Sequence, residues 1–286
     1  MDQPLFTDHF INVNNINLHY IDYENDNPPI LLMHGLTANA HAFDGLVANC
    51  LTTHFRVISP DLRGRGQSDH PAFQYSMEDH ALDIIGLLDH LNIDKVTLAG
   101  HSFGGLLGFY IASSYPGRVD KLIIMDAAAE MNPNAMEMLS YTFSRFNTLY
   151  PSWDDYISHV KRAPYNTFWD DAMLSYYQAD VKIDPDGTVK TRSNLTDIIE
   201  ISYGVANISW PYYIERITQP TLLINALDDY TMGEPLLPEE KAMETVEMMK
   251  NAHYVAVDGN HQTMLYGRDA KQIVKAIDKF TSVAKS

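Results

Sequence analysis

The chain has 286 residues, 45% of them hydrophobic, and a formal net charge of −17. An acidic chain of this kind repels phosphate backbones and anionic lipids, so we expect neither nucleic-acid nor membrane binding. No apolar run approaches the ~20 residues that a membrane span needs. Residues 1–4 lack the basic start of a secretory signal, so we expect a cytoplasmic protein.

The first predicted elements are the two strands of an antiparallel hairpin. Residues 10–13 and 16–20 alternate apolar and polar side chains on either side of Asn14-Asn15. An apolar run over 29–33 then predicts a buried strand that leads directly into His34-Gly35-Leu36-Thr37. A helix is expected near 43–51. It contains Cys50, the only cysteine, which therefore forms no intrachain disulfide and is expected to be a core thiol.

Strands and helices alternate through the next part of the chain. Strands are predicted over 56–59, 95–99 and 121–125, and helices over 76–91 and 106–114, the first of them capped by Ser76. This alternation predicts an α/β protein whose mostly parallel sheet is covered by helices on both faces. Ligands of such sheets bind outside the carboxyl ends of the strands.

The segment between the strand over 95–99 and the helix over 106–114 is the most informative motif. Gly100-His101-Ser102-Phe103-Gly104 has the pattern G-x-S-x-G, which places a serine on a sharp strand-to-helix turn with its oxygen exposed. The two glycines are required because a side chain at either position would collide across so tight a turn. Ser102 is the predicted nucleophile.

A nucleophilic serine needs a base, an acid that orients the base, and donors for the oxyanion. His261 follows the predicted last strand (252–257) and is the predicted base. Asp229 follows the strand over 220–225 and is the favoured acid, with Asp228 beside it as a rival. Asp126, directly after the strand over 121–125, is the third candidate.

The predicted oxyanion donors are the backbone N–H groups of Leu36 and Phe103. Leu36 belongs to the His34-Gly35 turn, and Phe103 follows the serine itself. His34, Gly35 and His101 are assigned to the substrate pocket together with Trp210.

The alternation of strands and helices is interrupted between about 129 and 211, where no strand is predicted. Residues 129–213 hold all three tryptophans and nine of the 17 tyrosines, and prolines divide the segment into short helical pieces. We therefore expect two domains, a core over 1–128 and 214–286 and a helical cap over 129–213. The inner face of the cap should line a pocket. The aromatic residues could also present a patch for homodimer formation, and the sequence leaves the oligomeric state open.

With these motifs the chain resembles the alpha/beta-hydrolase superfamily over nearly its whole length. The stretch Asp61-Leu62-Arg63-Gly64-Arg65-Gly66-Gln67-Ser68-Asp69 is similar to the family's glycine-rich loop. The resemblance implies an eight-stranded, mostly parallel sheet with an inserted helical cap, and a Ser102-His261-Asp229 triad that needs no cofactor. Zinc-ligand spacings such as H-E-x-x-H are absent from the sequence, so no metal is expected.

The resemblance also narrows the branch of the family. Dehalogenases and epoxide hydrolases of this superfamily carry Asp as the nucleophile, whereas position 102 is Ser, and proline iminopeptidases carry a His-Gly-Gly-Pro-Gly motif that is absent here. The predicted activity is that of a serine carboxylesterase acting on small-molecule esters or lactones. The alternatives are an acyl-homoserine lactonase, a C–C bond hydrolase, a perhydrolase, and a slow-turnover ligand receptor of the same fold.

Overall fold

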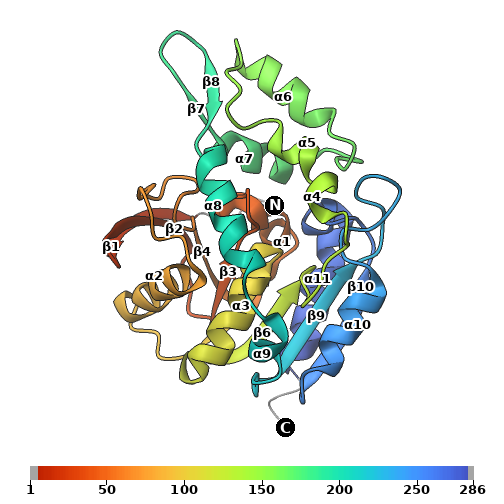
Figure 1. The fold of residues 1–286 in the computed structure, drawn as a ribbon. Coiled ribbons are helices and arrows are strands. Elements are labelled where there is room, and N and C mark those ends of the chain that lie inside the picture. The colour runs from red at the N-terminus through yellow and green to blue at the C-terminus, as the bar shows by residue number, and fades with distance from the viewer. Residues whose placement is uncertain (1–5, 283–286) are drawn as a thin grey trace.

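A computed structural model describes residues 6–282, and an eight-stranded sheet forms its centre (Figure 1). The strands lie in the order β1-β2-β4-β3-β5-β6-β9-β10. β1 and β2 pair antiparallel, as do β2 and β4, and all other neighbours are parallel, which confirms the predicted fold class. The strands span Thr7–Val13 (β1), Ile16–Tyr23 (β2), Pro29–Met33 (β3), Arg56–Pro60 (β4), Val96–His101 (β5), Val119–Met125 (β6), Thr221–Ala226 (β9) and Ala252–Val257 (β10).

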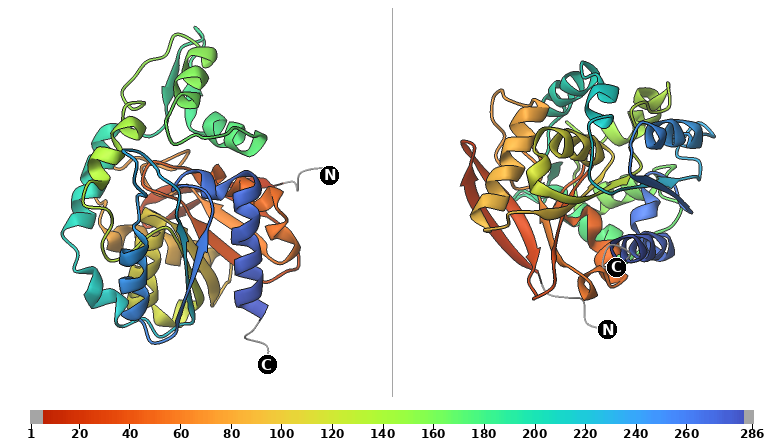
Figure 2. Two further views of the ribbon diagram at one scale, coloured as in Figure 1. Left: turned by 90° about the vertical axis from the view of Figure 1, so that its right-hand side faces the viewer. Right: turned by 90° about the horizontal axis from the view of Figure 1, so that it is seen from below.

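Side chains of the central strands alternate between two hydrophobic cores. In β3, Ile30 and Leu32 belong to one core, and Leu31 and Met33 belong to the other. Both faces of the central sheet are therefore buried, which is why its strands are continuous apolar runs. Figure 2 shows the helices on the two faces. One face is covered by α1 (Asp44–Ala48) and α11 (Gly267–Ser282), and the other by α2 (Met77–His90), α3 (Phe103–Ser114), α9 (Trp210–Ile214) and α10 (Glu239–Glu247).

The segment around Cys50 differs from its prediction. In place of one helix over 43–51, a 3-10 turn (η1, Ala40–Phe43) precedes α1, and a second (η2, Leu51–Thr53) follows it. Cys50 lies between α1 and η2 with a left-handed φ of 73° and is exposed. The core-thiol expectation is wrong because this left-handed turn carries the side chain to the surface. Two further 3-10 turns, η3 (Pro116–Arg118) and η4 (Thr263–Leu265), lie in connections.

Strand register brings the predicted site to one edge of the sheet. Met33 pairs with Gly100, His101 with Met125, Met125 with Ile224, and Ala226 with Val257. The residues that directly follow β3, β5, β6, β9 and β10 therefore lie at one edge, the carboxyl end of the parallel strands.

The segment between β6 and β9 forms a cap above that edge (Figures 1 and 2). It is mostly helical, but it also contains a two-stranded hairpin, whereas no strand is predicted there. The hairpin turns through Gly187, whose φ is 89°. The boundaries 129 and 213 stay a prediction. Apart from α9, which covers a face of the sheet, the elements of this segment are α4 (Ala135–Met138), α5 (Ser140–Phe143), α6 (Trp153–Lys161), α7 (Asp171–Ala179), β7 (Val181–Ile183), β8 (Val189–Thr191) and α8 (Leu195–Ala206).

Many of the cap's aromatic side chains pack against one another. Trp169 stacks on Tyr177 with ring centroids 5.3 Å apart, and Trp153 lies 5.7 Å from Tyr156. Tyr156 and Tyr177 are both buried in the core that the cap shares with α11. These rings stabilise the cap itself, in keeping with the large apolar area that aromatic residues bury. Within residues 6–282 no helix is both long enough and apolar enough to span a bilayer.

Candidate active site

Ser102 occupies a strained turn between β5 and α3. Its backbone has φ 54° and ψ −119°, a conformation that non-glycine residues rarely adopt. The flanking glycines permit the turn: a Cβ at Gly100 would overlap the carbonyl of Gly104, and one at Gly104 would overlap the carbonyl of Met33. The Ser102 N–H donates to the Met125 carbonyl at 2.9 Å, which ties the turn to the next strand. This geometry is that of a nucleophile elbow.

His261 is paired with Asp126. Its Nδ1 lies 2.7 Å from Asp126 Oδ2, and both side chains are buried. Because Nδ1 carries the proton of this hydrogen bond, Nε2 is left with a free lone pair. Ser102 and His261 line the same cavity, as a serine and its predicted base should.

The acid prediction is therefore corrected, since Asp229 is exposed and the carboxylate against His261 is that of Asp126. Asp126 directly follows β6 with a φ of 53°, and this left-handed turn aims its side chain along the sheet edge. Asp228 is exposed as well, and its Oδ2 accepts from the Gly259 N–H at 3.1 Å, so it supports the loop that carries His261.

The orientation of the first predicted oxyanion donor, the Leu36 N–H, is fixed by His34, which does not line the cavity. His34 Nε2 accepts from the Leu62 N–H at 3.0 Å, so its Nδ1–H donates to the Gly35 carbonyl at 2.8 Å. In a trans peptide the C=O and the following N–H point in opposite directions. Fixing the Gly35 carbonyl therefore turns the Leu36 N–H away from His34. Burial and the charge of Arg65 lower the pKa of His34 to about 4, which keeps the ring neutral.

The second predicted donor is oriented in the same manner by α3. The Ser102 carbonyl accepts from the N–H groups of Gly105 and Leu106 at 2.8 and 3.1 Å. It therefore points along the helix, and the Phe103 N–H points back out of the helix N-terminus, where a negative charge is stabilised. Gly35 adjoins the serine, since a Cβ there would lie 3.5 Å from Ser102 Cβ.

Two of the four predicted pocket residues line the cavity. Gly35 and His101 do, whereas the buried His34 lies behind the loop, and Trp210 lies in α9 beside α3. The pocket assignments of His34 and Trp210 are wrong because both side chains pack into the core. His101 Nε2–H donates to the His261 carbonyl at 2.9 Å, and burial lowers the pKa of His101 well below its usual value.

The cavity is small and has mixed polarity. Its volume is about 50 Å³, and its lining includes Leu139, Thr142 and Tyr176 from the cap and Tyr230 from the loop after β9. The Tyr230 hydroxyl lies 2.8 Å from Thr142 Oγ1. This volume is far below the roughly 300–1,000 Å³ of pockets for drug-sized ligands.

Two contacts tie the cap to the catalytic loops. The buried Arg145 guanidinium donates to the Thr37 carbonyl at 2.7 Å, next to Leu36, while its Nε lies 3.0 Å from Asp180 Oδ2. Asn260, which precedes His261, donates to the carbonyl of Tyr165 at 2.8 Å. The cap therefore supports the loop of the predicted oxyanion donor Leu36 and that of the predicted base His261.

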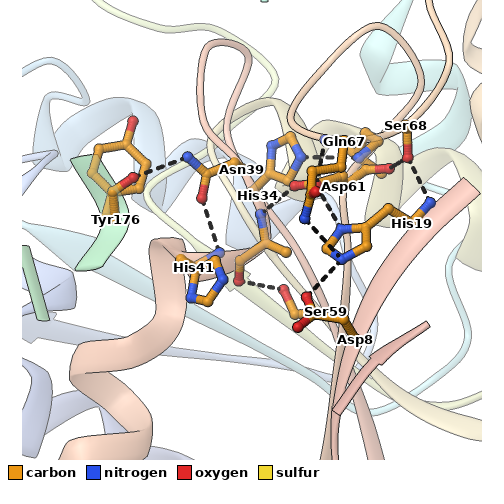
Figure 3. A network of polar contacts seen from close by, with 12 residues as sticks. Asp8, His19, His34, Asn39, His41, Ser59, Asp61, Gln67, Ser68 and Tyr176 are labelled. Carbon is orange, nitrogen blue, oxygen red and sulfur yellow. Dashed lines mark hydrogen bonds and ion pairs between the residues drawn. The ribbon is translucent and has the colours of Figure 1, made fainter. Parts of the chain in front are cut away.

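Asp61 joins the glycine-rich loop to the sheet and to the segment after β3 (Figure 3). Its carboxylate accepts from the N–H groups of Ala40 and Gln67 and from His19 Nδ1, at distances of 2.7, 2.8 and 2.7 Å. Burial alone would raise the pKa of Asp61, but its bonds with His19 and its other donors hold it below 3.8. The pKa of His19 is raised, because Asp61 and Asp8 outweigh its burial.

We expect Asp61→Asn to lower the free energy of unfolding by about 3 kcal/mol, because an amide presents a donor where the carboxylate accepted. A depressed Asp pKa gives stability that is present above 3.8 and lost as pH falls through the folded-state pKa. A raised His pKa gives stability that is present below 6.5 and lost as pH rises through the folded-state pKa.

The difference in unfolding free energy between wild type and Asp61→Asn should therefore be largest between about pH 3.8 and pH 6.5, where both contributions are present. Urea denaturation across pH measures it, with the exposed Asp26→Asn as control. A pH-independent difference would contradict the assigned role of the Asp61–His19 pair.

Within residues 6–282, no group of three or more His, Cys, Asp or Glu side chains is arranged to hold a metal ion.

Comparison with known proteins places this chain in a family. A sequence model described as alpha/beta hydrolase fold matches residues 28–267. Cis-3-alkyl-4-alkyloxetan-2-one decarboxylase from Shewanella oneidensis is 34% identical over 128 residues, which are 43% of this chain and 40% of that protein. The chain thus spans less than half the length of this relative.

Solved structures match over nearly the whole chain. E-2-(acetamidomethylene)succinate hydrolase has a TM-score of 0.86 at 22% identity, covering 97% of this chain and 100% of that one. The enol-lactonase from Burkholderia xenovorans LB400 has a TM-score of 0.72 at 21% identity, covering 96% and 100%. At these identities the likeness shows the fold alone, and the match over residues 28–267 shows the family. The chain belongs to the alpha/beta-hydrolase fold family.

Proposed function

We propose that this hydrolase cleaves small carboxylic esters or lactones through an acyl-enzyme on Ser102. The observation that carries the proposal is the 2.7 Å hydrogen bond between His261 and Asp126 beside a cavity that Ser102 also lines. A serine, a neutral histidine and a buried carboxylate form the arrangement that activates a hydroxyl for attack on a carbonyl.

In the proposed reaction, Ser102 Oγ attacks the carbonyl carbon and its proton passes to His261 Nε2. The carbonyl oxygen becomes an oxyanion that accepts from the N–H groups of Leu36 and Phe103, each worth roughly 3–4 kcal/mol by analogy with a measured donor. The carbon–oxygen bond then breaks, and His261 protonates the departing alkoxide. Water, deprotonated by His261, attacks the acyl-enzyme, and the carboxylic acid leaves as Ser102 regains its proton.

The same steps would hydrolyse a lactone, because a lactone is a cyclic ester. Its alkoxide remains attached to the acyl group after the carbon–oxygen bond breaks. The names of two similar proteins carry such rings, an oxetan-2-one and an enol-lactone. This chain is similar to both proteins, and small lactone rings are therefore candidate substrates for it.

The cavity volume predicts a preference for short acyl chains. We expect kcat/KM to be highest for p-nitrophenyl acetate to butyrate and at least about tenfold lower for the octanoate, because each excess methylene costs about 1–3 kcal/mol. Leu139→Ala should shift the optimum to longer chains, since Leu139 lines the cavity from the cap. Leu149→Ala, at a cap position that is 63% exposed, is the matched control.

An acyl-homoserine lactone assayed beside the esters separates a lactone preference from an ester preference. Fast multiple turnover supports an enzyme. A single slow turnover accompanied by a rise in the unfolding temperature would contradict it and favour a ligand receptor. A profile that rises with chain length would contradict the small acyl site.

A further inference from the structure

The second oxygen of Asp126 has its own set of donors. Oδ2 contacts His261, while Oδ1 accepts from the Ala226 N–H at 2.8 Å and from Asn225 Nδ2 at 2.9 Å. Asp126 and Asn225 are completely buried. One oxygen of the carboxylate thus faces the histidine, and the other is held by the end of the neighbouring strand β9.

Asn225 is itself fixed in one orientation. Its Nδ2 also donates to the Leu237 carbonyl at 3.1 Å, and its Oδ1 accepts from the Tyr254 hydroxyl at 3.1 Å. A flipped amide would place its oxygen against two acceptors, Asp126 Oδ1 and the Leu237 carbonyl, so these two contacts fix the orientation of the amide. The same Tyr254 hydroxyl lies 3.1 Å from Glu239 Oε1, so the chain of contacts runs from the surface to His261.

We propose that Asn225 is the positioning residue of this site: through its amide it fixes the rotation of the Asp126 carboxylate, so that Oδ2 faces His261 Nδ1. The role of this contact in turnover rests on the proposed function. Asp126 lies at a left-handed turn, and both donors to its Oδ1 come from the end of β9, the Ala226 N–H from the main chain and the Asn225 amide from a side chain. A hydrogen bond to an ionised group is stronger than one between neutral groups, so the amide of Asn225 favours one rotamer of the carboxylate.

An amide suits this position better than a carboxylate does. Nδ2 is a donor without charge, so it stabilises the ionised form of Asp126 and does not compete with His261 for it. An aspartate at position 225 would keep the shape but place a second carboxylate 2.9 Å from Asp126 Oδ1. Two carboxylates at that separation share one proton and ionise together only at raised pH.

The first test is kinetic. Asn225→Ala should lower kcat roughly 10- to 100-fold with KM within about twofold, because the substrate pocket is untouched and only the alignment of the base is lost. The acidic midpoint of kcat/KM should move to higher pH, since a carboxylate with fewer donors stabilises the imidazolium form of His261 more strongly. Tyr254→Phe should show the same changes at smaller size, because Asn225 stays in place.

Asn225→Asp gives the sharpest outcome. Below the pH at which the shared proton is lost, the protonated carboxyl of this variant donates as the amide of Asn225 does, and activity should stay within about tenfold of wild type. Above it, two charges repel, and kcat should fall along an alkaline limb that wild type lacks. The titratable and charged groups around Asp126 and position 225 are His261, His101, Tyr254 and Glu239.

The control is Gln219→Ala. Gln219 is also a buried amide, but it lies before β9, at the far end of that strand, and donates to the carbonyls of Ala112 and Pro116. It should lower the unfolding temperature without moving kcat or the pH midpoint per folded molecule. If Asn225→Ala behaves in the same way as Gln219→Ala, Asn225 is only structural and the proposal is overturned.

A spectroscopic measurement needs no substrate. The Nδ1 proton of His261, hydrogen-bonded to Asp126, should give a downfield ¹H resonance that His261→Gln abolishes. We expect Asn225→Ala to shift or broaden it and Gln219→Ala to leave it unchanged. A folded Asn225→Ala protein with the wild-type resonance overturns the proposal. A perturbed resonance in a protein that hydrolyses no ester supports Asn225 as the positioning residue and contradicts only the proposed function.

Discussion

Replacing Asp126 by Asn should lower kcat for p-nitrophenyl acetate by about 10⁴-fold, whereas Asp229→Asn should leave it within about twofold. The Asp126 carboxylate accepts the Nδ1 proton of His261 at 2.7 Å and so keeps Nε2 free to act as the base. An asparagine in its place can donate to Nδ1, which moves the proton to Nε2 and leaves no lone pair facing Ser102. The exposed Asp229 has no such influence on the ring.

Steady-state kinetics of the two variants beside wild type, with the folded fraction checked by circular dichroism, measure this contrast. Asp228→Asn is a useful third variant, because Asp228 supports Gly259 in the His261 loop without contacting the ring. A large loss in Asp229→Asn together with normal activity in Asp126→Asn would refute the assignment of the acid.

Ser102→Ala should lower ester hydrolysis by about 10⁵- to 10⁶-fold, the loss that removal of a serine nucleophile causes in a well-studied hydrolase. The residual rate would come from the oxyanion donors and from binding. The variant should also lose all labelling by a fluorophosphonate probe, which reacts with activated serines. Ser114→Ala, at the exposed far end of α3, is the matched control and should keep both properties.

Fold and function respond differently to this change. The Ser102→Ala protein should unfold at a temperature close to that of wild type, since Ser102 donates only its backbone N–H to Met125. Ester turnover that survives in the folded variant would show that another group performs the chemistry. Loss of activity with retained probe labelling would show that the probe reacts elsewhere.

Two of the catalytic candidates could be placed from the sequence because a local pattern marks each. Ser102 lies between two glycines that the tight turn requires, and His261 follows the last apolar run of the chain. The acid has no such mark. Asp126, Asp228 and Asp229 all follow predicted strands, and what separates them is the left-handed turn at Asp126 together with the donors that β9 supplies.

The positions that sequence reasoning misplaced share a physical cause. His34 is predicted in the pocket from its turn after a strand and Trp210 from its aromatic insertion, yet the direction of a side chain depends on packing against elements distant in sequence. The cap hairpin escaped notice because β7 and β8 are three residues each, too short for a period of two to be recognised. The sequence does carry a signal for Asn225, since an asparagine directly after the apolar run Leu222–Ile224 of a buried strand is unusual unless its amide is hydrogen-bonded.

The contact between Arg145 and Thr37 bears on how this protein can be re-engineered. Arg145 belongs to the cap, yet it holds the carbonyl that follows Leu36. A cap exchanged for that of a relative would remove this anchor, and turnover would drop along with the intended change in selectivity. Libraries that diversify the cap should therefore keep Arg145 and its partner Asp180 constant, or vary residues 34–37 in the same round.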